Sequence, residues 1–275
     1  MTQTVNLQDT PDFAAITTRQ RQTWATGDFN VIALSVMAAS EQLVEAVNPH
    51  PGARVLDVAC GSGNASIVAA RRYCDVTGID YVPDLIMRAR QRAAAEGTKI
   101  DFREGDAQAL PVADASFDVV LSVFGVMFAP DQQRAANELL RVCRSGGTIG
   151  LANWMPEGWG GDLFRALAKH LPAPPPGMKP GVRWGTEEGV RELLGAGTTT
   201  ITTTRRVFTQ YYRSLEHALD MFFTYYGPTV KALNSPLGPD AVRQDVEAVF
   251  RKYNKATDGT CAMRCEYMHV IATRR

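Results

Sequence analysis

Residues 24–154 alternate between short apolar runs and amphipathic segments, and this alternation constrains the fold more than any other feature of the sequence. Strands that alternate with helices are typical of a parallel sheet with helices on both faces. We therefore predict a doubly wound, mostly parallel, Rossmann-like α/β sheet. The expected strands span 54–59, 75–80, 99–104, 117–123 and 148–154, and the expected helices span 24–47, 64–73, 82–96 and 130–143.

The pattern changes after residue 154. A proline-rich stretch at 171–181 is typical of a surface excursion, and 198–212 is rich in the β-branched and aromatic residues that favour strands. Helical spacing returns at 215–226 and 239–253, and a last apolar run at 266–272 indicates a further strand. These two late strands predict an antiparallel C-terminal addition to one edge of the sheet.

The same pattern predicts the domain organisation. We expect one main domain at 53–275, preceded by a helical cap at 1–52 in which the polar residues 1–22 are frayed or form a lid. The prolines at 49 and 51 separate the cap from the first strand, because proline cannot continue a helix. Within the main domain, 155–197 and 213–265 are expected to be insertions.

The charge balance limits the partners that the chain can have. Lys and Arg together number 29, and so do Asp and Glu, so the formal net charge is zero. Neutralising phosphates needs a surplus of Lys and Arg, and we therefore expect no nucleic-acid partner. The N-terminus lacks the apolar core of a signal peptide, and the longest near-apolar run, 119–129, is too short for a bilayer. We expect a cytoplasmic protein with no integral membrane association.

The five cysteines do not suggest a disulfide framework, because their number is odd and the chain is long. Cys261 and Cys265 are the only close pair, and no second Cys pair or paired His accompanies them. A structural zinc site needs four such ligands, so we expect no bound metal. The sequence makes no prediction about the oligomeric state.

A glycine-rich turn follows the first expected strand, and an acidic residue ends the second. Gly61 and Gly63 leave room for a ligand to approach the backbone. Asp80, 19 residues after Gly61, is placed to accept hydrogen bonds from the hydroxyls of a ribose. Ligands of open α/β sheets bind at the carboxyl ends of the strands, so these residues predict a nucleotide site there.

The residues around this turn distinguish between kinds of nucleotide. The dinucleotide fingerprint has Gly or Ala where this chain has Ser66. Asp57, four residues before Gly61, would repel a pyrophosphate, whereas it suits a ligand that carries positive charge. A nicotinamide-dependent oxidoreductase is therefore an alternative that the turn disfavours without excluding it.

Five segments of the chain agree with one known set of motifs in their order. They read DVACGSGN at 57–64, GID at 78–80, EGDAQALP at 104–111, SFDVVLSVFGVMF at 116–128 and LLRVCRSGG at 139–147. Together they resemble the class I S-adenosylmethionine-dependent methyltransferases, and most of all the small-molecule branch typified by ubiquinone- and menaquinone-biosynthesis methyltransferases. Ser145 departs from the Pro-Gly-Gly that usually ends the last segment. The resemblance covers residues 20–155 and implies S-adenosyl-L-methionine as the cofactor.

The resemblance implies roles for the matching positions. Asp57 would lie near the ammonium group of the cofactor, and Asp80 would hold its ribose. Tyr81 would lie against the adenine, and Asp106 would accept a hydrogen bond from the adenine amino group. The positions expected to contact the cofactor are Asp57, Ala59, Gly61, Gly63, Asp80, Tyr81, Asp106, Ala107, Ser122, Phe124 and Trp24.

The resemblance also implies the reaction, which is transfer of a methyl group to a small molecule. Amino-methyltransferases of nucleic acids and proteins usually carry Asn/Asp-Pro-Pro-Tyr/Phe after the fourth strand, where this chain reads SVFG at 122–125. Aromatic residues in the insertions favour a flat acceptor, so we predict O- or C-methylation of a small aromatic or lipophilic molecule. The candidate acceptor residues are Trp184, Phe222, Tyr225 and Tyr226, and the candidate general base is His217.

Several of these positions have a purely structural alternative. The aromatic candidates, Phe124 and Trp24 could belong to the core, Asp106 could cap a turn, and His217 could cap a helix. Because no base is evident, a non-catalytic module that only holds S-adenosylmethionine is a third alternative beside the transferase and the oxidoreductase.

Overall fold

Seven strands form a single sheet in the computed structural model, which describes residues 11–275. They are β1 (Arg54–Val58), β2 (Asp75–Asp80), β3 (Ile100–Glu104), β4 (Phe117–Val123), β5 (Cys143–Trp154), β6 (Thr198–Tyr212) and β7 (Cys261–Arg274). Their order is β3-β2-β1-β4-β5-β7-β6. Strands β1 to β5 are parallel to one another, whereas β7 pairs antiparallel with β5 and β6. This order confirms the predicted doubly wound sheet and its antiparallel edge.

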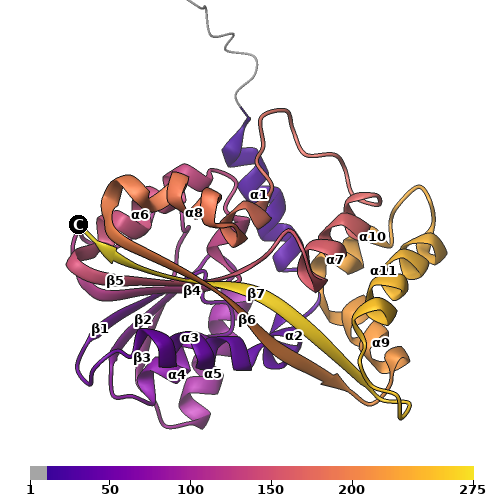
Figure 1. Cartoon of the computed structure of the whole chain (residues 1–275), viewed down its shortest axis with the longest axis horizontal. Helices are drawn as coiled ribbons and strands as arrows, with labels where there is room; N and C mark the ends of the chain where they lie inside the picture. The colour runs from indigo at the N-terminus through magenta and orange to yellow at the C-terminus, as the bar shows by residue number, and fades with distance from the viewer. Residues whose placement is uncertain (1–10) are drawn as a thin grey trace, which may run out of the picture.

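Helices cover both faces of the sheet (Figure 1). One face carries α3 (Met37–Val47), α4 (Asn64–Ala70) and α5 (Pro83–Ala95), and the other carries α6 (Gln132–Val142) and α8 (Glu187–Leu194). Beyond the sheet, where β6 and β7 project, lie α7 (Trp159–Ala168), α9 (Leu215–Tyr225), α10 (Gly227–Ala232) and α11 (Pro239–Tyr253). The remaining elements are α1 (Phe13–Trp24), α2 (Phe29–Ser35), and the short 3-10 helices η1 (Val126–Phe128), η2 (Gly181–Gly185) and η3 (Gly195–Gly197).

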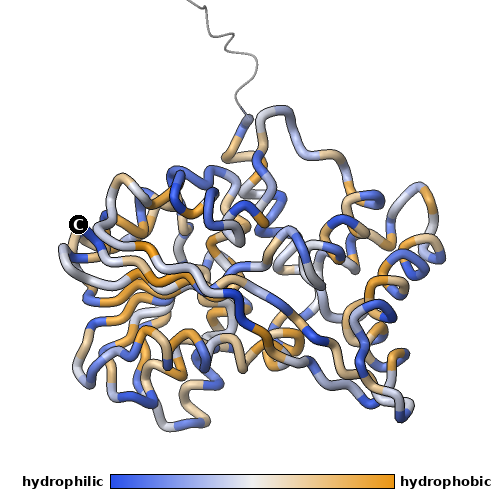
Figure 2. The backbone as a smooth tube through the Cα atoms, in the orientation of Figure 1, coloured by the Kyte–Doolittle hydropathy of each residue, from blue (hydrophilic) through white to orange (hydrophobic). Residues whose placement is uncertain are grey.

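The central strands are hydrophobic because helices bury both of their faces (Figure 2). In β4, Val120 and Leu121 point to opposite faces and are both fully buried. On β5, Gly150 lets α3 approach closely, since a Cβ atom there would lie 2.5 Å from a methyl carbon of Val47. The packed centre leaves the carboxyl ends of the strands as the edge at which loops can form a site.

The N-terminal region is not the single helix that the apolar spacing at 24–47 predicts. Gly27 lies between α1 and α2, and its φ of 77° ends the helical conformation there. A Cβ atom at this position would lie 2.6 Å from the carbonyl oxygen of Tyr225. Asp28 then begins α2 by accepting a hydrogen bond from the amide of Asn30. The region predicted to be frayed or lid-like, 1–22, contains most of α1, and its first ten residues lie outside the described part of the chain.

Strand β7 is longer than the expected 266–272 because it pairs with β6 along its whole length. Cys261 and Cys265 therefore lie in a strand, with both side chains buried. The division into a cap at 1–52 and insertions at 155–197 and 213–265 stays a prediction.

In the described part of the chain, no single helix has the length and apolarity needed to cross a bilayer. Only the bent pair of α2 and α3, with 60° between its members, meets these two criteria when both helices are counted together. The cytoplasmic location and the absence of a nucleic-acid partner stay predictions.

Candidate functional site

A cleft opens at the carboxyl ends of β1 and β4, where the strand order changes direction. From β1 the chain proceeds to β2 on one side, and β4 lies on the other side, which is where open α/β sheets bind ligands. Two non-glycine residues there have left-handed backbone conformations, Ala59 with a φ of 52° and Phe124 with a φ of 52°. A Cβ atom at Gly125 would lie 2.6 Å from the carbonyl oxygen of Ala59, so the two loops are in close contact. Such strained positions are common at functional sites.

The cleft holds about 900 Å³ of space when its open mouth is included. It contains nine of the eleven positions that the motif resemblance assigned to a cofactor. These nine are Trp24, Asp57, Ala59, Gly61, Asp80, Tyr81, Asp106, Ala107 and Phe124.

The other two expected positions, Gly63 and Ser122, do not line the cleft. Gly63 has a φ of 85°, and a Cβ atom there would lie 2.9 Å from the ring of Phe102. The Ser122 hydroxyl donates a 2.7 Å hydrogen bond to the carbonyl oxygen of Val58 and accepts one from the amide of Val126. Both residues therefore shape the loops that border the cleft, and their direct contact with a ligand stays a prediction.

Asp57 is buried at the end of β1 with 1% of its surface exposed. Its Oδ2 accepts hydrogen bonds from the amide and from the hydroxyl of Ser66, at 2.8 and 2.6 Å. Burial nevertheless raises the pKa of Asp57 to about 7, because the loss of water outweighs these two bonds. A cation in the cleft would favour the ionised carboxylate.

Asp80 connects the end of β2 to the glycine-rich turn. Its Oδ2 accepts a 2.8 Å hydrogen bond from the amide of Gly61, and its Oδ1 accepts a 2.9 Å bond from the amide of Val82. Burial raises the pKa of this carboxyl to about 6, against the effect of the backbone bonds. A carboxylate has about four acceptor positions, so Asp80 can still accept the hydroxyls of a ribose.

Gln108 joins three parts of the cleft, and sequence reasoning did not single it out. Its side-chain amide donates to both carboxylate oxygens of Asp106 at 3.1 Å and to the hydroxyl of Thr17 on α1 at 3.0 Å. Its Oε1 accepts a 2.8 Å bond from the amide of Asp131 at the start of α6. The residue thus ties the acidic group expected to bind adenine to the helix that covers the cleft.

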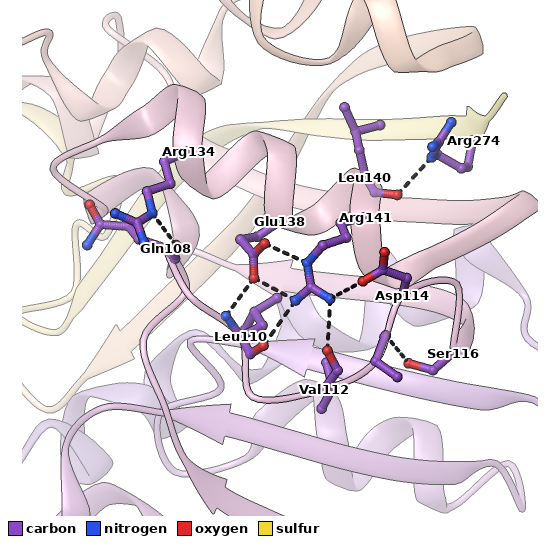
Figure 3. Close-up of polar contacts among 11 residues, drawn as sticks. Gln108, Leu110, Val112, Asp114, Ser116, Arg134, Glu138, Leu140, Arg141 and Arg274 are labelled. Atoms are coloured by element: carbon purple, nitrogen blue, oxygen red, sulfur yellow. Dashed lines mark hydrogen bonds and ion pairs between the residues drawn. The ribbon is translucent and has the colours of Figure 1, made fainter.

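A network of charged side chains on α6 holds the loop that carries Asp106 (Figure 3). The Arg141 guanidinium donates to the carbonyl oxygens of Leu110 and Val112, and Glu138 accepts a 2.7 Å bond from the amide of Leu110. Arg141 also bonds Glu138, and this contact lowers the pKa of the Glu138 carboxyl. The network positions the loop and does not itself line the cleft.

Helices α1 and α2 cover the cleft with aromatic side chains. The Trp24 ring contacts those of Phe29, Phe128 and Tyr226, with centroid distances of 5.4, 4.9 and 5.8 Å. Phe29 also lies 3.8 Å from the position a Cβ atom would take at Gly61. Trp24 therefore lines the cleft and also packs against the aromatic side chains that cover it, and its contact with the cofactor stays a prediction.

The residues predicted to bind an acceptor lie elsewhere. Trp184 and Phe222 are fully buried, Tyr226 is buried against the Trp24 ring, and none of these three or Tyr225 is among the residues that line the cleft. Most of their aromatic surface is used in packing, and their contact with an acceptor stays a prediction.

His217, the predicted candidate base, also lies outside the cleft lining. It is in the first turn of α9, where its Nδ1 accepts a 3.3 Å hydrogen bond from the amide of Arg213. The apolar part of the cleft is formed instead by residues of α2, of the turn between α2 and α3, of the end of β4 and of the segment that follows it: Phe29, Ala33, Val36, Val123, Phe128, Ala129 and Pro130. Of these, only Val123 and Phe128 fall within the sequence motifs, and none was assigned to a site.

The lining fits a ligand that carries positive charge and a ribose. Three carboxylates, those of Asp57, Asp80 and Asp106, converge there, and in the described part of the chain no Lys, Arg or His lines the cleft. A buried acid is stabilised by a nearby cation, whereas a pyrophosphate would find no positive partner.

Comparisons with known proteins identify the same family. A family model described as a methyltransferase domain matches residues 55–147. An uncharacterized protein of Mycobacterium tuberculosis is 40% identical over 97% of this chain and 99% of its own. The demethylmenaquinone methyltransferase of Deinococcus radiodurans is 38% identical over 49% of this chain and 55% of its own.

The fold comparison agrees with this relationship. The YcgJ protein from Bacillus subtilis has a TM-score of 0.60 at 17% identity and covers 86% of this chain and 99% of its own. With the matched family model, the full-length relative and the acid-lined cleft, the nicotinamide-dependent alternative is set aside. The chain belongs to the class I S-adenosylmethionine-dependent methyltransferases, and S-adenosyl-L-methionine is its cofactor.

Proposed function

We propose that this methyltransferase acts on an oxygen or carbon atom of a small, uncharged, aromatic or lipophilic acceptor. The observation that supports this most strongly is the composition of the cleft beyond the expected cofactor site. That part is lined by apolar and aromatic residues, among them Val36, Phe128 and Pro130. In residues 11–275 no basic side chain lines the cleft, so a carboxylated or phosphorylated acceptor would lose water without gaining a partner.

One of the relatives supports the same class of acceptor. The Deinococcus protein is named a demethylmenaquinone methyltransferase, and its similarity to this chain extends over about half of each protein. A quinone-like ring is flat and uncharged, which suits an aromatic, apolar pocket. We extend to this chain the chemical class of such an acceptor.

The protein would act mainly by orientation and by excluding water. The cofactor supplies an electrophilic methyl group on a positively charged sulfur. In this proposal the carboxylate of Asp57 binds the amino-acid end of the cofactor, that of Asp80 binds its ribose, and Trp24 and Phe29 cover it. Alignment of the acceptor with the methyl group can account for much of the rate enhancement, and a dry cleft strengthens the electrostatic interactions within it.

The titratable side chains in the described lining are Asp57, Cys60, Asp80, Tyr81 and Asp106. Burial and the two nearby acids raise the pKa of the Cys60 thiol well above its usual value. The proposal therefore favours acceptors that ionise readily, such as phenols and hydroquinones, over those that need a strong base.

The test is a competition between matched acceptors. The purified protein is incubated with S-adenosylmethionine and with pairs of phenols or naphthohydroquinones that differ by one carboxylate or phosphate. Mass spectrometry identifies the product and the methylated atom. We expect methylation of the neutral member, with kcat/KM at least roughly tenfold above that of its charged analogue, a difference of about 1.4 kcal/mol.

Three outcomes would contradict the proposal. Preference for the charged member would contradict it, because no basic side chain in the described lining could pair with the added negative charge. Methylation of amines alone would replace O- or C-transfer by N-transfer. Tight binding of S-adenosylhomocysteine with no methylated product from any acceptor class would favour the non-catalytic module.

A further inference from the structure

The hydroxyl of Ser40 is a buried polar group without a partner in the wall of the cleft. Ser40 lies on α3 and is fully buried. Among the residues of 11–275 that line the cleft, it alone has a fully buried side-chain polar atom that makes no hydrogen bond. A helical serine often bonds the carbonyl oxygen four residues earlier, here that of Val36, but this bond is not formed. An unpaired buried hydroxyl is unfavourable, so one that lines a cleft indicates a ligand atom.

Several hydrogen-bond donors of the glycine-rich turn already have partners. The amide groups of Cys60, Gly61 and Gly63 each donate to an oxygen of the protein. The side-chain amide of Asn64 donates to the carbonyl oxygen of Ala33 at 2.7 Å. A ligand group that needs a donor at this end of the cleft would therefore gain from a side-chain donor that is not already bonded, and the Ser40 hydroxyl is one.

The cofactor has such a group. Its amino-acid end carries an ammonium, for which Asp57 is a suitable partner, and a carboxylate, which needs a hydrogen-bond donor. In the described lining no Lys, Arg or His is present to supply it. We propose that the Ser40 hydroxyl donates a hydrogen bond to the α-carboxylate of S-adenosylmethionine.

The position of Ser40 in the fold agrees with this assignment. Helix α3 packs beside α4 on one face of the sheet (Figure 1), and the first residues of α4, Asn64 and Ala65, line the cleft. Asp57 bonds Ser66 of α4, so its carboxylate points to the same face. Ser40 and Asp57 thus approach the cleft from one side, as partners for the two charges of one amino-acid group should. The assignment depends on the cofactor alone and not on the acceptor proposed above.

Two nucleosides and one variant test the assignment. S-Adenosylhomocysteine carries the amino-acid end, whereas 5′-methylthioadenosine has the same adenosine and sulfur without it. Calorimetry measures both affinities in the wild-type protein and in Ser40→Ala. We expect Ser40→Ala to weaken binding of S-adenosylhomocysteine by roughly 10- to 100-fold, the effect of losing a hydrogen bond to a charged group. Binding of 5′-methylthioadenosine should change by less than about twofold.

Thr229 provides a matched control. Its hydroxyl is also fully buried and unpaired, but it lies on α10 and is not part of the cleft lining. Thr229→Val should therefore leave both affinities unchanged. Thermal unfolding of the ligand-free variants checks their folding, and Ser40→Ala should unfold at the wild-type temperature or above it, because a buried unpaired hydroxyl is removed.

Equal weakening of both nucleosides would overturn the proposal, since it would indicate a general distortion of the cleft. Unchanged binding of both would overturn it as well. An increased KM for a methyl acceptor with unchanged binding of S-adenosylhomocysteine would assign the hydroxyl to the acceptor instead. None of these binding results depends on which acceptor is methylated, so failure here leaves the proposed function intact.

Discussion

The protonation of Asp57 allows a quantitative test of how the cleft recognises charge. Burial raises the pKa of this carboxyl to about 7, so below pH 7 the ligand-free protein holds a proton there. An ammonium group bound beside Asp57 favours the carboxylate and expels that proton. Binding of S-adenosylhomocysteine should therefore become tighter as the pH rises from 5.5 to 8.

The size of the effect follows from the pKa. If the bound ligand lowers the pKa of Asp57 below 5, deprotonation at pH 5.5 costs about 1.5 pKa units, or about 2 kcal/mol. The affinity at pH 5.5 should then be roughly 30-fold weaker than at pH 8. Asp80, with a pKa of about 6, adds a smaller effect at the acidic end.

Calorimetry in two buffers with different ionisation enthalpies measures both the affinity and the number of protons released. Near pH 6 we expect the release of close to one proton, because the carboxyl of the free protein is mostly protonated there. Asp57→Asn provides the control: its side-chain oxygen can still accept from Ser66, but the group no longer titrates. A wild-type affinity that does not change with pH would refute the reasoning, and so would an equally steep dependence in Asp57→Asn.

Three further substitutions test other parts of the site. Asp80→Asn should weaken S-adenosylhomocysteine by about 1.5–3 kcal/mol, the range for a hydrogen bond to a charged group, and an unchanged Kd would remove Asp80 from the ribose site. Gln108→Ala removes the bond to Thr17, so hydrogen exchange should become faster across α1, and an unchanged rate would show that Gln108 does not hold this helix. His217→Ala should leave kcat/KM within about twofold, whereas a loss of roughly 100-fold or more is what removal of a general base produces.

The sheet and the cofactor half of the cleft could be predicted because short stretches of sequence determine them. Asp57, Gly61 and Asp80 lie at the ends of adjacent parallel strands, and parallel strands end at one edge of the sheet. The spacing of residues along the chain therefore translates directly into proximity in space. Nine of eleven expected positions line the cleft for this reason.

The cover of the cleft could not be predicted in the same way, because it depends on contacts between distant segments. The break at Gly27 fits closely against the carbonyl oxygen of Tyr225, about 200 residues later in the chain. Gln108 gains its role only when α1 is in place to offer Thr17. Helical spacing alone also could not distinguish Ser40, which lines the cleft, from its fully buried neighbours Ala39 and Leu43.

The excess of acid over base in the cleft connects cofactor binding, acceptor choice and product release. Methyl transfer converts a positively charged sulfur into a neutral thioether, so the product has one positive charge fewer than the cofactor. Asp57, Asp80 and Asp106 line the same cleft and attract the cofactor more strongly than the product. An anionic acceptor would be repelled by these same carboxylates, whereas a neutral phenol can enter without that repulsion. One distribution of charge thus favours the cofactor, an uncharged acceptor and the departure of the spent nucleoside.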